Sequence, residues 1–161
     1  MQNNNLSKIS ELFDIKYGNS LELINLTQVS SDNKNGIPYI SRTEKNNGVS
    51  AFVEPIFDID TNAAHTLSVA VGGSVLSTFY QPEPYYTGFH ILVLYPKKTY
   101  SKLEMLFYAY CIQLNKYKYS YGRQANRTLK DILIPTEMPK EYLSFEQDIS
   151  NSISKSLKNI F

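Results

Sequence analysis

Two β-rich stretches constrain the fold of this chain more than any other feature of its sequence. The run GFHILVLYP at 88–96 is almost continuously apolar, which is typical of a strand buried on both faces. The segment 67–79 divides at Gly72-Gly73 into LSVAV and SVLSTF, and this pattern predicts a hairpin. The longest apolar run, at 67–76, has about half the length of a membrane-spanning helix, so no membrane segment is predicted.

A second hairpin is predicted earlier in the chain. IPYISRT at 37–43 and GVSAFVEP at 48–55 both have the composition of strands. Between them, Asn47-Gly48 tolerates the positive φ of a tight turn. Residues 17–36 are polar and rich in asparagine and serine, which predicts a loop with one strand around LELINL.

Two segments before the C-terminus have helical periodicity. LSKISELFDIK at 6–16 predicts a short helix, and the clearest helix spans 101–118. In the second, Ser101 and Glu104 form a capping box, and apolar residues follow at spacings of three and four. We expect this stripe to pack on the sheet, with Cys111 as a buried core residue. The stripe consists of Leu103, Leu106, Phe107, Tyr110, Cys111, Leu114 and Tyr117.

A last helix is predicted at the C-terminus. Its apolar stripe consists of Phe145, Ile149, Ile153, Leu157 and Ile160. Because the stripe reaches the final Phe161, we expect it to fold back on the body, to begin a longer helix or to form a pairing surface. The predicted fold class is α+β: a mixed, mainly antiparallel twisted sheet with hairpins, one packed amphipathic helix and this C-terminal helix. The body is expected at 1–138 and the helix at 139–161.

The charges of the chain are unevenly distributed. Although the net charge is +1, the segment from Lys97 to Lys130 has eight basic residues and one acid. Such a segment suits local phosphate binding, and a merely solvated face is the alternative. The single cysteine, Cys111, excludes an internal disulfide, and the polar N-terminus MQNNNLSKIS has no signal-peptide pattern. A cytoplasmic location is therefore predicted.

No catalytic or metal site can be assembled from the sequence. His65 and His90 lack Cys or His neighbours at ligand spacing, and the paired glycines of AVGGSV do not have the spacing of a phosphate loop. Asp58 and Asp60 form a DxD pair that suits a divalent metal, which leaves a magnesium-dependent nuclease as an alternative. We predict no catalytic residues, no metal and no cofactor, and this favours a binding role.

The segment GRQANRTLKDILIP at 122–135 has the clearest signature of a binding site. The chain has three arginines against thirteen lysines, and two of the arginines lie here with two amide side chains between them. Arginine, glutamine and asparagine make bidentate contacts with guanine and adenine edges. We expect Gly122 to turn the chain out of the preceding helix, and Leu129, Ile132 and Ile134 to anchor the loop rigidly. Ordinary surface polarity beside a buried strand is the alternative.

Three further segments complete the predicted DNA-contact set. The tip of the 37–53 hairpin is polar and exposed by geometry, and FYQPEPYYTG adds an aromatic and an amide side chain. NKYKYSYGR alternates tyrosines with cations, which suits sugars and phosphates, although a frayed helix end would have the same pattern. Gln124 and Arg127 are the predicted base readers. The full set is Arg42, Lys45, Asn46, Asn47, Tyr80, Gln81, Lys116, Lys118, Tyr119, Arg123, Gln124, Asn126, Arg127 and Lys130.

A different class of function fits the loop 79–89. It contains Tyr80, Tyr85 and Tyr86 with few charges, a pattern that also suits a β-rich module binding a glycan or a protein. Binding that is indifferent to salt would distinguish this alternative from DNA recognition.

The order of three motifs resembles a known family. IPYISRTEKNNGV, then GGSVLSTFYQPEPYYTGFHILVLYP, then GRQANRTLKDILIP with a helix after it, is similar to the target recognition domain of restriction–modification systems. Such domains occur in the DNA-specificity subunits of type I enzymes and in related fused restriction–methylation enzymes. The resemblance covers nearly the whole chain, although specificity subunits usually carry two such domains and two long helices.

The resemblance implies a division of labour between this chain and other subunits. It implies a mixed α/β recognition domain without catalytic activity, which binds double-stranded DNA and directs methylation and cleavage by others. The implied partners are a methyltransferase (modification) subunit, which flips the target base, and an endonuclease subunit. The final helix is similar to the opening of the family's conserved spacer helix, and it is a candidate for self-association.

Overall fold

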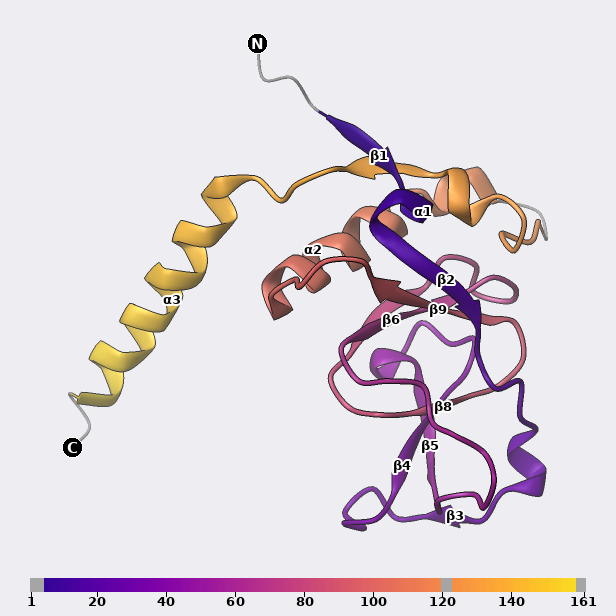
Figure 1. Ribbon diagram of the computed structural model, residues 1–161. Helices are drawn as coiled ribbons and strands as arrows, with labels where there is room; N and C mark the ends of the chain where they lie inside the picture. Colours follow the sequence, from indigo (N-terminus) through magenta and orange to yellow (C-terminus); the bar gives the residue numbers. More distant parts are fainter. Residues whose placement is uncertain (1–4, 120–122, 159–161) are drawn as a thin grey trace.

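The computed structural model describes residues 5–119 and 123–158 (Figure 1). Its central sheet is antiparallel and has the strand order β2 (Phe13–Tyr17), β9 (Ile91–Pro96), β6 (Thr66–Ala70), β7 (Thr78–Gln81). Every residue of β6 and the first four residues of β9 are buried. The predicted buried strand and the predicted hairpin between β6 and β7 are therefore confirmed.

A second sheet has the strand order β3 (Gln28–Val29), β5 (Val49–Val53), β4 (Ile37–Ile40), β8 (Tyr86–Thr87). Strand β8 runs parallel to β4, whereas the other pairs are antiparallel, so the fold is mixed as predicted. In Figure 1 this sheet lies below the central one. The short 3-10 helix η2 (Asn46–Gly48) joins β4 to β5, with φ values of 51°, 56° and 79° along its residues. The predicted positive-φ turn is confirmed.

The N-terminal segment differs from the prediction of one helix over 6–16. It consists of β1 (Leu6–Lys8), a single helical turn α1 (Ile9–Leu12) and β2. One turn is enough to bury Ile9 and Leu12, and the chain then extends to pair with β9. The strand predicted around LELINL is also wrong. That segment contains the 3-10 helix η1 (Leu23–Asn25), and β3 follows it.

Helix α2 (Lys102–Gln113) has the predicted capping box, in which the Glu104 N–H donates to the Ser101 side chain at 3.1 Å. The predicted packing face is only partly correct, because Cys111 is buried and Phe107 packs against the core, whereas other members of the stripe are exposed. The side chains buried against the central sheet and β10 are Met105, Tyr108, Ala109, Cys111 and Ile112. Of the predicted stripe, Leu106, Tyr110 and Leu114 are 45%, 61% and 55% exposed. The helix is apolar on both sides, so spacing alone does not identify the face that meets the sheet.

The rest of the chain links α2 to a projecting helix. The 3-10 helices η3 (Lys116–Tyr119) and η4 (Leu129–Asp131) precede β10 (Leu133–Pro135), which pairs with β1. Helix α3 (Lys140–Lys158) then extends away from both sheets (Figure 1). Its apolar residues Phe145, Ile149 and Ile153 are exposed, and the last stripe residue, Ile160, lies outside the described residues together with Phe161. No helix in the described part of the chain is long and apolar enough to cross a membrane.

The two faces of α2 predict opposite effects of truncation. Ile112 is fully buried, so Ile112→Ala should lower the free energy of unfolding by about 2–5 kcal/mol. Leu114, two residues away, is 55% exposed, and Leu114→Ala should change it by about 0.5 kcal/mol at most. Urea denaturation of the two variants provides the comparison. Equal destabilisation would contradict the assignment of the packed face.

Candidate nucleic-acid interface

Three segments that are distant in sequence meet around the backbone of Val71. Its N–H donates to the carbonyl oxygen of His90 at 2.9 Å, and its own carbonyl oxygen accepts the N–H of Ala125 at 3.1 Å. The hairpin tip also reaches this place, because a Cβ added to Gly73 would lie 3.2 Å from the Cβ of Arg42. Val71 is 1% exposed. A buried backbone unit therefore joins the loop before β9 to the loop before η4, and the turn after β6 holds the hairpin tip.

All three arginines of the chain border this junction. Arg42 lies against the Gly72-Gly73 turn, while Arg123 and Arg127 flank Ala125 in the sequence. Each of the three side chains is exposed. We call the exposed side chains at 42–46 and 123–127 the arginine surface. The structure thus brings together the two segments that the sequence marks as polar recognition loops.

The loop 123–128 is held by a residue that the sequence analysis did not single out. Ala125 is fully buried, and its carbonyl oxygen accepts the N–H groups of Thr128 at 3.2 Å and Leu129 at 2.9 Å. Leu129 is fully buried, as predicted. Gln124 and Asn126, on either side of the buried alanine, are both exposed. A lone small apolar residue between polar neighbours was the signal available for this anchor. The role predicted for Gly122 lies outside the described residues.

The amides of Asn47 and Gln81 are used within the protein. The Asn47 side chain donates to the carbonyl oxygen of Tyr80 at 3.0 Å. Gln81 donates from its own side chain to the Asn47 carbonyl oxygen and to the Ser68 hydroxyl, both at 3.0 Å. Gln81 is 3% exposed, so its prediction as a DNA contact is corrected: it has no surface to offer a duplex. Instead, this pair fastens the hairpin tip to the central sheet.

Tyr80 is corrected for the same reason. The side chain is 6% exposed, and its hydroxyl hydrogen-bonds the Nδ1 atom of His65. The neighbouring tyrosines of loop 79–89 are also buried, since Tyr85 is 0% and Tyr86 is 2% exposed. Burial raises the pKa of the Tyr85 hydroxyl, which shares a 2.8 Å hydrogen bond with the Thr66 hydroxyl. The loop therefore presents none of these tyrosines to a ligand, and nothing supports the alternative of glycan or protein binding there.

Residues 116–119 connect the two halves of the arginine surface. The Lys116 ammonium lies 3.1 Å from a Glu44 carboxylate oxygen and donates to the Ser77 hydroxyl at 3.0 Å. Tyr119 shares a 2.6 Å hydrogen bond with the hydroxyl of Thr128. These two predicted contact residues therefore hold loops, Lys116 at the hairpin and Tyr119 at the 123–128 loop. Both have intermediate exposure.

The other predicted cations and the Asn46 amide lie at the surface. Lys45, Lys118 and Lys130 are exposed, on the hairpin tip, η3 and η4 respectively. Asn46 is exposed and donates from its side chain to the Val49 carbonyl oxygen at 3.1 Å, which closes the turn.

Within the described residues, the carboxylates and the cysteine that the sequence analysis considered do not form a catalytic or metal centre. Asp58 and Asp60 are both exposed, and no group of three or more potential metal-ligating His, Cys, Asp or Glu residues occurs in the described part of the chain. Burial raises the pKa of the Cys111 thiol to about 11, so the thiol is protonated at neutral pH. Cys111 is buried, as predicted.

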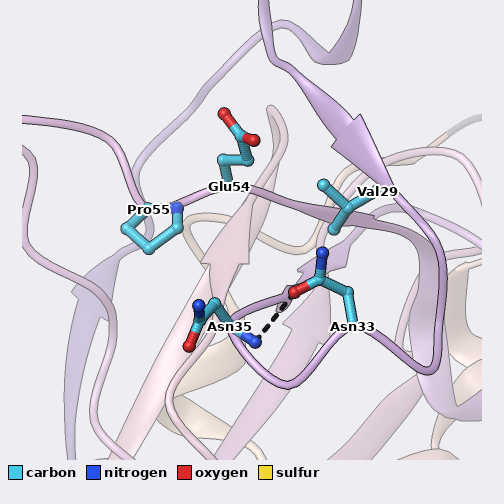
Figure 2. A pocket seen from close by; sticks show the side chains of 5 residues that line it. All are labelled: Val29, Asn33, Asn35, Glu54 and Pro55. Atoms are coloured by element: carbon cyan, nitrogen blue, oxygen red, sulfur yellow. Dashed lines mark hydrogen bonds between the residues drawn. The ribbon is translucent and has the colours of Figure 1, made fainter.

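A surface pocket lies elsewhere, beside the second sheet. It has a volume of about 430 Å³ and is lined by Val29, Asn33, Asn35, Glu54 and Pro55. Figure 2 shows that the Asn33 side chain turns towards the backbone of Asn35, whose N–H donates to it at 2.9 Å. None of the predicted contact residues lines this pocket, so it does not extend the arginine surface.

Comparison with known families places the chain in a class of DNA-specificity domains. The family model described as Type I restriction modification DNA specificity domain matches residues 1–136. The chain belongs to this family, as the resemblance indicated. The search of curated proteins found no match.

Solved structures of type I systems have a similar fold. The S subunit from M. genitalium is 20% identical with a TM-score of 0.61, and the match covers 99% of this chain and 41% of that chain. The HsdS subunit from Thermoanaerobacter tengcongensis is 14% identical with a TM-score of 0.64, covering 96% and 39%. A structure described as showing complex assembly and conformational transition of the type I R-M system is 16% identical with a TM-score of 0.65, covering 99% and 41%. This chain therefore spans about two fifths of the length of these chains.

The hydrogen bonds of Gln81 predict a structural role for it. Gln81→Ala would remove the donor that serves both the buried Ser68 hydroxyl and the Asn47 carbonyl oxygen. The free energy of unfolding should fall by roughly 1–3 kcal/mol. Lys118→Ala, at an exposed position, is the matched control and should be near neutral. Thermal unfolding of both variants provides the measurement, and a Gln81→Ala variant as stable as the control would contradict this structural role.

Proposed function

We propose that this chain recognises a specific sequence in double-stranded DNA and supplies that specificity to partner subunits. The carrying observation is the convergence of all three arginines on one junction, with exposed amides between them. Arginine binds phosphate and guanine bidentately, and glutamine and asparagine do the same for adenine. Buried anchors on the central sheet hold these groups, which gives the rigid presentation that sequence discrimination needs.

The contact residues separate into two proposed classes. Gln124 and Arg127, next to the buried Ala125, are proposed to contact base edges in the major groove. Lys45, Lys118 and Lys130 are proposed to contact phosphates, which position a duplex without reading it. Arg42, Arg123, Asn46 and Asn126 complete the proposed surface. Lys116 and Tyr119 are proposed to support it from behind, because their polar atoms already bind Glu44 and Thr128.

The chemistry is proposed to occur on other subunits. A methyltransferase subunit would flip and modify the target base, and an endonuclease subunit would cleave unmodified DNA. We propose no catalytic role and no cofactor for this chain, and a cytoplasmic location. Two observations support this assignment: the family membership of the chain, and the arginine surface, whose side chains offer hydrogen-bond donors for binding DNA.

Helix α3 is proposed to serve assembly. Its exposed Phe145, Ile149 and Ile153 form a stripe that is unfavourable in water. Similar chains of known structure are more than twice as long as the sequence given, and this supports the proposal of a larger unit. We propose that 1–138 is the recognition domain and that 139–161 pairs with a second helix, supplied by another copy of this chain.

The proposed function is tested with the chain assembled with its modification subunit. Fluorescence anisotropy at physiological salt should show a duplex selected from a random pool binding far more tightly than a random duplex. Equal affinity for both duplexes would contradict sequence recognition.

The two contact classes predict different losses. Gln124→Ala and Arg127→Ala should each cost about 1–3 kcal/mol on the selected duplex and relax preference at one position. Lys118→Ala and Lys130→Ala should weaken selected and random duplexes alike and lower the salt dependence by about one charge. If Gln124→Ala and Arg127→Ala leave both affinity and preference intact, the loop 123–128 is structural.

The proposed assembly role of α3 predicts that charges in its apolar stripe will lower the mass of the associated species in solution. Ile149→Lys combined with Ile153→Lys places charges in the apolar stripe and should shift sedimentation towards the monomer. Asn151→Lys, at an exposed polar position on the same helix, should leave association unchanged. An unchanged sedimentation coefficient for the double variant would remove α3 from the interface.

A further inference from the structure

We infer that Arg42 and His90 together bind one phosphate of the DNA backbone. This inference rests on the proposed function and adds a residue that lies outside the predicted contact set. His90 precedes β9, and its carbonyl oxygen accepts the N–H of Val71, whose own carbonyl oxygen accepts the N–H of Ala125 in the loop 123–128. The Gly72-Gly73 turn lies between it and the hairpin tip.

The two side chains converge over Gly72. A Cβ added to Gly72 would lie 3.5 Å from an Nη atom of Arg42, and 3.5 Å and 3.6 Å from the Cβ and Cγ atoms of His90. The guanidinium and the imidazole thus approach one point from two different loops. Gly72 is buried, whereas both converging side chains belong to exposed residues. These distances are ordinary van der Waals separations, so both side chains lie next to the same point over Gly72.

The backbone of His90 is held in an unfavourable conformation. Its φ is 59°, in the left-handed region that costs a non-glycine residue about 1–2 kcal/mol. The hydrogen bond from the Val71 N–H to its carbonyl oxygen helps to fix it there. Strained positions of this kind persist where the surroundings determine them, and they concentrate at ligand-binding sites. The conformation of this loop therefore determines the position of the His90 side chain next to Arg42.

The chemistry of the pair suits a phosphate. A guanidinium only donates hydrogen bonds, and an imidazole donates from a ring nitrogen, so the pair matches a ligand with adjacent acceptor oxygens. In contrast to Lys116, Arg42 takes part in none of the ion pairs of the described residues. Gly73 beside the pair is exposed and has no side chain, which lets a sugar-phosphate backbone approach closely. A phosphodiester therefore fits this site better than a base edge does, because a base edge lies behind the sugar-phosphate backbone of its own strand.

His65 provides a matched control. It is also exposed and has a φ of 58°, but its ring is bound to the Tyr80 hydroxyl. Glycine adopts positive φ without strain, so His90→Gly and His65→Gly each remove a ring without imposing an unfavourable backbone. The assembled complex with its modification subunit is titrated with selected and random duplexes by anisotropy over a series of salt concentrations.

His90→Gly should weaken both duplexes by the same factor, about 3- to 10-fold, whereas His65→Gly should stay within about twofold. Arg42→Ala should also weaken both, and the double variant with His90→Gly should lose less than the product of the two single losses, because one phosphate is shared. Unchanged binding by His90→Gly, a loss confined to the selected duplex, or fully multiplicative losses would each overturn the inference. Failure of the proposed function would give a different result from failure of this inference, because the complex without any substitution would then bind the selected and random duplexes equally.

Discussion

The two backbone hydrogen bonds made by Val71 determine the geometry of the arginine surface. One ties the loop before β9 and the other ties the loop 123–128 to the end of β6. Because Val71 is buried, loss of either bond would leave a buried polar group without a partner. The two loops are thereby held in register with the central sheet. The polar contacts of Asn47 and Gln81 extend the same framework to the hairpin tip.

The parts of the fold that local chemistry determines were predictable from the sequence. Continuous apolar runs identified β6 and β9, Asn47-Gly48 identified the turn before β5, and Ser101 identified the start of α2. The segment 6–16 was mispredicted because its partner β9 is remote in sequence. Helical spacing of a few apolar residues is satisfied equally by one turn followed by a strand, and only pairing with β9 distinguishes the two.

The candidate site was predictable to the extent that exposure follows from residue type. Arg123 and Arg127 lie at the surface because guanidinium groups are seldom buried without partners. Tyr80 and Gln81 have side chains that suit either a core or a surface, so their burial depends on packing that no local pattern encodes. The same limit applies to His90, whose position beside Arg42 results from the meeting of two loops.

The alternation of buried and exposed residues at 124–126 has an evolutionary consequence. Ala125 carries the attachment to the body, and its neighbours Gln124 and Asn126 extend into solvent without supporting any core packing. Selection on stability therefore acts on the first residue and hardly on the other two. Substitutions at positions 124 and 126 therefore change the chemistry that the loop presents to solvent, while the attachment through Ala125 is inherited intact.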